Sequence, residues 1–256
     1  MGKGNLRLAA VAFSVMLLLS ACTKAGESKE DYRLAGIEAL NAGDYEAAIS
    51  AFDASLEESR GKVGDFQLDV LKYRAEAEYF IEDYQAAAHT YDVLIQVDDE
   101  LPEYLIRRSM SYAAMGEIDL ASADYKRAKE LDPQAVDLNH AMLALTAAME
   151  EADGYENQAL ELYEQAIANG WENAEIYNRM GKNQMDAGNY EKALDCFQKG
   201  LAFSDEAVTQ DLLFNQAVTY EYMGQFDTAR DLFDRYIEQY GDDEAAKREL
   251  EFLKTR

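Results

Sequence analysis

Small, apolar and aromatic residues recur along the chain at a spacing that predicts pairs of helices. Six alanines are each followed, four residues later, by an aromatic residue: Ala48 and Phe52, Ala87 and Tyr91, Ala121 and Tyr125, Ala159 and Tyr163, Ala193 and Phe197, Ala229 and Phe233. A small residue stands twelve positions before each alanine: Gly36, Ala75, Ser109, Ala147, Gly181 and Ala217. Successive alanines lie 39, 34, 38, 34 and 36 residues apart. The chain therefore repeats one unit six times, with short insertions between some copies.

Each unit is expected to be two antiparallel helices joined by a short corner. Helices approach closely only where their side chains are small, so paired positions such as Gly36 and Ala48 favour a tight crossing. Glycines stand where the first helix of a unit should end: Gly43, Gly116, Gly154, Gly188 and Gly224. That position often takes a left-handed conformation, so Glu82 makes the second corner less favourable. Apolar and polar residues do not alternate as in strands, and no sheet is expected.

The period and the pattern resemble the tetratricopeptide repeat, in which an aromatic residue, a leucine, a small residue and a tyrosine precede an alanine, an aromatic residue and a proline. The third copy matches best, with Leu105, Ser109, Tyr112, Gly116, Ala121, Tyr125, Ala128 and Pro133 in register. The resemblance covers residues 29–243, in copies at 29–62, 68–101, 102–135, 140–173, 174–207 and 210–243. It implies an all-α, right-handed superhelical solenoid.

The segment after the last repeat is expected to cap the stack. Repeat arrays need a terminal element that covers the exposed end of the core. In residues 244–256, Ala246, Leu250 and Leu253 share one helical face. We therefore expect a C-terminal capping helix.

The N-terminus has the layout of a cleaved secretion signal. Lys3 and Arg7 precede an apolar run, and small residues stand before Cys22. The run is too short for the roughly 17 to 25 apolar residues of a spanning helix. The motif Leu19-Ser20-Ala21-Cys22 resembles a bacterial lipobox. This resemblance implies a signal peptide at 1–21, lipidation of Cys22 and a linker at 22–28.

A lipidated Cys22 would anchor the protein to the cell membrane or the outer membrane, facing the extracytoplasmic side. The alternative is an ordinary secretory signal with an incidental cysteine. Cys196 is the second of only two cysteines, so a lipidated Cys22 leaves it without a partner for an internal disulfide.

The formal charge of the chain, −26, argues against nucleic acid as a partner. An acidic surface repels phosphates and anionic lipid headgroups. Contact with a membrane should therefore come from the lipid at Cys22.

In tetratricopeptide repeat proteins the first helix of each unit lines a concave, partner-binding face. Carried over by position, the predicted groove consists of Arg33, Ile37, Lys72, Tyr79, Ile106, Met110, Asn178, Lys182, Met185, Phe214, Val218 and Tyr222. Further residues at these positions are Leu40, Glu76, Ala113, Ala144, Ala148 and Glu151. The groove is largely apolar, and an apolar groove can hold an extended or helical peptide. Packing against neighbouring first helices is the alternative for each residue.

The family's chaperone-binding members hold a terminal carboxylate with a lysine at position 5 and an asparagine at position 9 of the repeat. Here Arg33 occurs with Ile37, and Lys72 with Glu76, so that clamp is absent. Two acids, Glu78 and Glu150, occupy a position where the family prefers a bulky residue.

A buried acid needs a partner. Arg74 and Arg108 are candidate partners for the acids at this position, unless those acids face solvent.

Catalysis has little support in the sequence. His89 and His140 are the only histidines, and their spacing matches neither a zinc site nor a nucleophile–base pair. Cys196 precedes the core residue Phe197 and is interpreted as a packing residue. No cofactor or metal is expected.

The resulting hypothesis is a membrane-anchored, non-enzymatic adaptor that binds an unidentified protein or peptide at the bacterial cell envelope. Two alternatives remain open. One is an envelope scaffold that self-associates into homo-oligomers, and the other is an enzyme with an unrecognised site.

Overall fold

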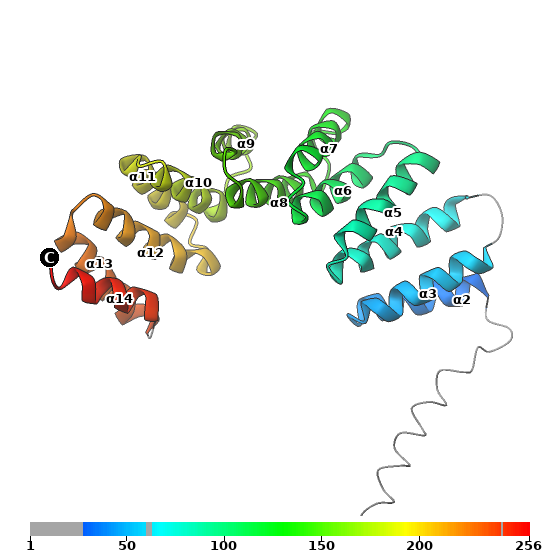
Figure 1. Cartoon of the computed structure of the whole chain (residues 1–256), viewed down its shortest axis with the longest axis horizontal. Coiled ribbons are helices and arrows are strands. Elements are labelled where there is room, and N and C mark those ends of the chain that lie inside the picture. The colour runs from blue at the N-terminus through cyan, green and yellow to red at the C-terminus, as the bar shows by residue number, and fades with distance from the viewer. Residues whose placement is uncertain (1–27, 60–62, 242) are drawn as a thin grey trace, which may run out of the picture. The chain divides into compact units, whose positions relative to one another are not determined.

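The computed structural model describes residues 28–59, 63–241 and 243–256. Over these residues the chain forms thirteen helices and no strand, so the predicted all-α fold is confirmed (Figure 1). The helices are α2 (Lys29–Asn41), α3 (Tyr45–Glu58), α4 (Asp65–Phe80), α5 (Tyr84–Val97), α6 (Pro102–Ala114), α7 (Ile118–Leu131), α8 (Leu138–Glu151), α9 (Glu156–Ala168), α10 (Ala174–Asp186), α11 (Tyr190–Leu201), α12 (Glu206–Tyr222), α13 (Phe226–Tyr240) and α14 (Glu244–Leu253). The predicted signal peptide and Cys22 lie outside the described residues.

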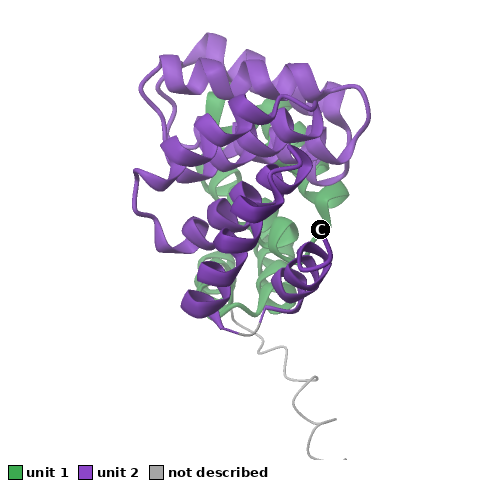
Figure 2. Ribbon diagram, turned by 90° about the vertical axis from the view of Figure 1, so that its left-hand side faces the viewer, with its two compact units in different colours: residues 1–111 green, residues 112–256 purple. Residues whose placement is uncertain are grey.

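The chain divides into two compact units, residues 1–111 and 112–256, and the division falls within α6 (Figure 2). In unit 1, α2 pairs with α3 and α4 pairs with α5, while α3 packs against α4. In unit 2, α10 pairs with α11 and α12 pairs with α13, while α11 packs against α12. Each predicted copy contains two successive helices, although α4, α8 and α12 begin before the copies predicted at 68–101, 140–173 and 210–243.

A close contact between a glycine and an aromatic ring fixes the crossing within two of the pairs. A Cβ atom added at Gly36 would overlap the ring of Phe52, and one added at Gly181 would overlap the ring of Phe197. Both rings are fully buried. The small residue and the aromatic residue of the repeat therefore meet in the core, which explains why both recur in the sequence.

The corners between the two helices of a pair adopt the left-handed backbone conformation that the glycines predict. Gly43, Gly116, Gly154, Gly188 and Gly224 have φ values between 73° and 93°. Glu82 takes the same conformation in the second copy, with φ 64°. A side chain at this backbone conformation is strained because its Cβ crowds the following carbonyl oxygen, whereas glycine is not.

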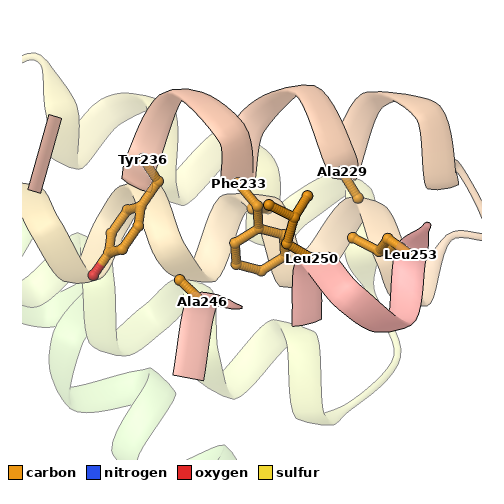
Figure 3. Packing of buried hydrophobic residues seen from close by; sticks show 7 residues of the cluster. Ala229, Phe233, Tyr236, Ala246, Leu250 and Leu253 are labelled. Carbon is orange, nitrogen blue, oxygen red and sulfur yellow. The ribbon is translucent and has the colours of Figure 1, made fainter. Parts of the chain in front are cut away.

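At the C-terminus, α14 covers the end of the core of unit 2, as predicted (Figure 3). Ala246, Leu250 and Leu253 are buried against α13, where Leu250 lies beside the ring of Phe233. Asp243 starts the helix by accepting hydrogen bonds from the backbone N–H groups of the first turn. This cap satisfies donors that the helix itself leaves unpaired.

The buried acid Glu78 lies in a polar network that joins three helices of unit 1. Arg74 on α4 contacts a Glu78 carboxylate oxygen at 2.6 Å and donates to Asp53 on α3 at 2.7 Å. Thr90 on α5 donates to the other oxygen of Glu78 at 2.7 Å. Burial raises the pKa of Glu78, and the charge of Arg74 and the bond from Thr90 oppose that rise. Arg74 is therefore the partner of Glu78, as the sequence suggested.

The equivalent acid in unit 2, Glu150, finds a different partner from the one the sequence suggested. Arg179 on α10 donates to one Glu150 oxygen at 2.9 Å, and Tyr163 on α9 donates to the other at 2.7 Å. Arg108 instead pairs with Asp92 in unit 1. The cation for Glu150 comes from the following copy, whereas both candidate arginines lie in earlier copies.

No helix among the described residues is both long enough and apolar enough to cross a membrane.

Glu82→Gly should stabilise the protein by about 1 kcal/mol, because it removes the strain of a side chain in the left-handed region. The measurement is the free energy of unfolding by urea, followed by circular dichroism. Glu82→Ala is the matched control, since it removes the same charge but keeps the Cβ atom. Equal gains from both variants would attribute the effect to charge and contradict the backbone explanation.

Arg74→Met should destabilise the protein by about 2 kcal/mol, because it leaves the Glu78 carboxylate buried without its cation. The pKa of Glu78 is then raised further above its ordinary value of 4.5, so the folded state holds a proton that the unfolded state releases. Stability must therefore fall as pH rises through the folded pKa and recover on acidification.

Urea unfolding between about pH 8 and about pH 5 measures this dependence. The double variant Arg74→Met with Glu78→Leu should lose the added pH dependence, because no carboxylate remains at the site. A pH profile of Arg74→Met that parallels that of the original chain would contradict this assignment.

Candidate partner-binding surface

Six residues of unit 1 enclose an open hollow of about 120 Å³ on the side of the predicted groove. We call it the aromatic hollow, and its lining is Glu76, Tyr79, Phe80, Tyr91, Arg107 and Met110. The lining comes from α4, α5 and α6. Three residues expected at the groove positions, Glu76, Tyr79 and Met110, therefore meet at one cavity.

Stacked rings from neighbouring copies hold the rim of the aromatic hollow in place. Tyr45 on α3 stacks on Phe80 at the end of α4, with ring centroids 5.0 Å apart and planes 21° apart. Tyr79 packs edge-on against Phe80 and against Tyr84 at the start of α5, with centroids 6.2 Å and 5.2 Å apart. Despite these contacts Phe80 is 48% exposed. An aromatic face therefore remains available at a position that the packing fixes.

The hollow combines buried or half-buried tyrosines with two charged side chains. Burial raises the pKa of Tyr79 and of Tyr91, so both phenols stay neutral at physiological pH. The charge of Arg107 opposes the rise at both tyrosines, and the charge of Glu76 adds to the rise at Tyr91. Arg107 also makes a contact within the protein. Glu76 makes no hydrogen bond or ion pair with any described residue.

The cations at position 5 of the first two copies are already paired. Arg33 binds Asp69 of the next copy through two nitrogen atoms. Lys72 approaches Glu103 of the next copy at 3.7 Å. Ile37 packs against the core of unit 1. These predicted groove residues therefore contact the next copy, and each of the two cations already has an acidic neighbour there.

Most of the predicted groove residues of the last two copies also take part in packing. Asn178 is buried and accepts a hydrogen bond from Asn215 on α12 at 3.0 Å. Met185 packs against a core cluster of unit 2, and Phe214 and Val218 pack against another. Ile106, in the third copy, is also buried. For these five residues, burial or packing inside the protein accounts for the apolar or amide side chain.

Lys182 and Tyr222 remain accessible in unit 2. Lys182 is exposed beside a polar depression of about 450 Å³ that it shares with Glu150, Glu156, Asn157, Asn183, Asp186 and Ala187. Tyr222 is 56% exposed and packs against Tyr190, with ring centroids 6.0 Å apart. The polar depression is not aromatic, so it differs chemically from the aromatic hollow.

Three residues of the aromatic hollow were absent from the predicted groove. Phe80 directly follows Tyr79 at another position known to line the groove in this family, so the positional rule could have found it. Tyr91 was expected only as the core aromatic of its copy, yet it both fills the core and floors the hollow. Arg107 lies one residue after the predicted Ile106, a shift that sequence alignment alone does not resolve.

The residues with catalytic or redox chemistry do not line the hollow. His89 and His140 are both exposed, on α5 and α8. Cys196 is buried, and its burial raises the pKa of the thiol, which favours the unreactive protonated form. Within the described ranges, no three His, Cys, Asp or Glu residues are grouped so as to hold a metal ion.

Solved structures share this fold at low sequence identity. A tetratricopeptide repeat protein from Parabacteroides merdae has a TM-score of 0.58 at 15% identity, over 96% of this chain and 91% of that one. The apo form of RapI has a TM-score of 0.72 at 12% identity, over 96% of this chain and 75% of RapI. PilW, a widely conserved type IV pilus biogenesis factor, has a TM-score of 0.66 at 16% identity, over 90% of this chain and 99% of PilW.

Family models described as tetratricopeptide repeat match residues 33–102, 102–135, 174–207 and 211–243. Together these ranges span more than half of the 256 residues. The matches at 102–135 and 174–207 have the same bounds as the third and fifth copies read from the sequence. The helix pairs, the glycine corners and the contacts between small and aromatic residues agree with these matches, and the chain belongs to the tetratricopeptide repeat family.

Proposed function

We propose that this protein is a membrane-anchored adaptor that holds a segment of another protein in the aromatic hollow of unit 1, at the bacterial cell envelope. The family fold suggests a role in protein interaction, because stacked helix pairs present extended surfaces to a partner. Proteins of this family are generally non-enzymatic scaffolds, so we propose binding and not catalysis.

The single observation that supports binding at this place is the half-exposed ring of Phe80 at a cavity that Tyr79, Tyr91 and Met110 also line. Burying apolar surface contributes about 25 cal/mol per Å². Aromatic side chains in pockets are also typical anchors of protein interfaces. Met110 adds a flexible side chain that adapts to the shape of an incoming group.

The membrane anchor is supported by the sequence of the N-terminal segment. Lys3 and Arg7 precede an apolar run that ends at the lipobox-like motif containing Cys22. A lipid on Cys22 would hold the repeat units at the membrane surface. The described helices then begin only a few residues later, at Lys29.

Photo-crosslinking tests the adaptor function. A photoreactive amino acid in place of Met110 should capture one dominant partner in the native cell, because the hollow seats a partner segment. The same probe in place of His89, which is exposed on α5 and also belongs to unit 1, is the matched control. Mass spectrometry identifies the crosslinked partner protein.

Two results of this experiment would contradict the adaptor function. Capture of the same protein at both positions would show contact without selectivity for the hollow. Capture of a second copy of the chain at Met110 would favour the self-associating scaffold.

Fatty-acid labelling tests the membrane anchor. Cys22→Ala should abolish incorporation of labelled fatty acid and move the protein from the membrane to the soluble fraction, because the acyl chains provide the membrane affinity. Cys196→Ala is the matched control and should keep both the label and the membrane association. Unchanged labelling and fractionation of Cys22→Ala would overturn the anchor.

A further inference from the structure

Two charged side chains line the aromatic hollow, and Glu76 is the one without a hydrogen bond or ion pair to the described residues. Arg107 already makes a contact within the protein. Arg33 and Lys72, the groove cations of the first two copies, are paired with Asp69 and Glu103. Glu76 lines the hollow and makes no hydrogen bond or ion pair with any described residue. A partner therefore meets one carboxylate that is available for a hydrogen bond or an ion pair.

The apolar part of the hollow has room for one side chain. Its volume is about 120 Å³, slightly below the roughly 150 Å³ of a cavity that holds one benzene molecule. Tyr79, Tyr91 and Met110 supply walls without a charged atom. The cavity thus suits a leucine, methionine or phenylalanine side chain better than a polar one.

The exposed ring and the carboxylate are close in sequence and share one helical face. Phe80 follows Glu76 by one helical turn on α4, a spacing that brings side chains together. An aromatic face attracts a cation, most strongly where water is partly excluded. A Lys or Arg side chain that reaches Glu76 can therefore also lie over Phe80.

The overall charge of the chain also favours a positively charged partner. The chain carries a formal charge of −26, and a field of this sign increases the rate at which positively charged segments arrive. It repels acidic peptides and nucleic acid phosphates. Local and long-range electrostatics therefore favour a cationic partner.

We propose that the occupant of the aromatic hollow is a basic amphipathic segment of a partner protein, which inserts one apolar side chain beside Met110 and pairs a neighbouring Lys or Arg with Glu76. This inference rests on the proposed function, because it concerns the same hollow. It adds the chemical class of the partner.

Three short synthetic peptides test the inference with the full chain in detergent solution. The first is an amphipathic helix with leucine and phenylalanine on one face and lysine and arginine on the other. The second replaces the basic residues by glutamate and aspartate. The third keeps the basic residues and replaces the apolar ones by serine. Fluorescence anisotropy of the labelled peptides gives each dissociation constant.

The first peptide should bind at least about tenfold more tightly than either of the others, because only it supplies both the apolar side chain and the charge-assisted hydrogen bond. Glu76→Gln should remove most of the preference for the basic peptide over the acidic one. Glu57→Gln is the matched control, since Glu57 is exposed on α3 and does not line the hollow. It removes the same charge and should leave the preference unchanged.

Different results would contradict this inference alone, or this inference together with the proposed function. If basic and acidic amphipathic peptides bind equally and Met110→Arg abolishes both, the hollow binds partners but the basic class is wrong. If Glu57→Gln weakens binding as much as Glu76→Gln, the attraction is the general charge of the chain and the inference also fails. If no peptide binds and the photoreactive probe at position 110 captures no protein in the cell, both this inference and the proposed function are wrong.

Discussion

The structure depends on a close contact between a small residue on the first helix of a pair and an aromatic ring on the second. Gly36 against Phe52, and Gly181 against Phe197, leave no room for a Cβ atom. Close-packed interiors resist even one added methyl group, so this contact sets how closely the helices of a pair approach. The remaining first-helix positions are then free to link one copy to the next or to face a partner.

The repeat and its helix pairs could be predicted from sequence because the residues that build them have few substitutes. Only glycine adopts the corner conformation without strain, and the exception at Glu82 was recognised because the other copies show glycine at that place. The binding surface was predicted less well. Positional rules identify which residues lie on the first helix. They do not show which of these residues are buried inside the protein and which remain accessible to a partner. Asn178 and Ile106 are buried, whereas Tyr79 and Met110 meet at a cavity.

Some charged side chains on the surface are paired within the protein, whereas others remain accessible to a partner. The cations Arg33, Arg74 and Arg179 each bind an acid of a neighbouring helix or copy. Sequence shows that such charges are present but not which partner each one meets, as the pairing of Glu150 with Arg179 illustrates. At the hollow, Phe80 presents an exposed aromatic face, and the carboxylate of Glu76 makes no hydrogen bond or ion pair with a described residue. A strongly acidic protein with the groove cations of its first two copies already paired is therefore suited to cationic and not anionic partner segments.

Nuclear magnetic resonance of 13C-labelled methionine methyl groups tests the central claim most directly, because methionines occur both in the hollow and in the core. On titration of the full chain with the basic amphipathic peptide, the Met110 signal should shift, since its methyl group would contact the inserted side chain. Met142 and Met149, each 1% exposed in the core, should keep their positions. A Met110 signal that does not move while the peptide binds would place the partner elsewhere and contradict the account.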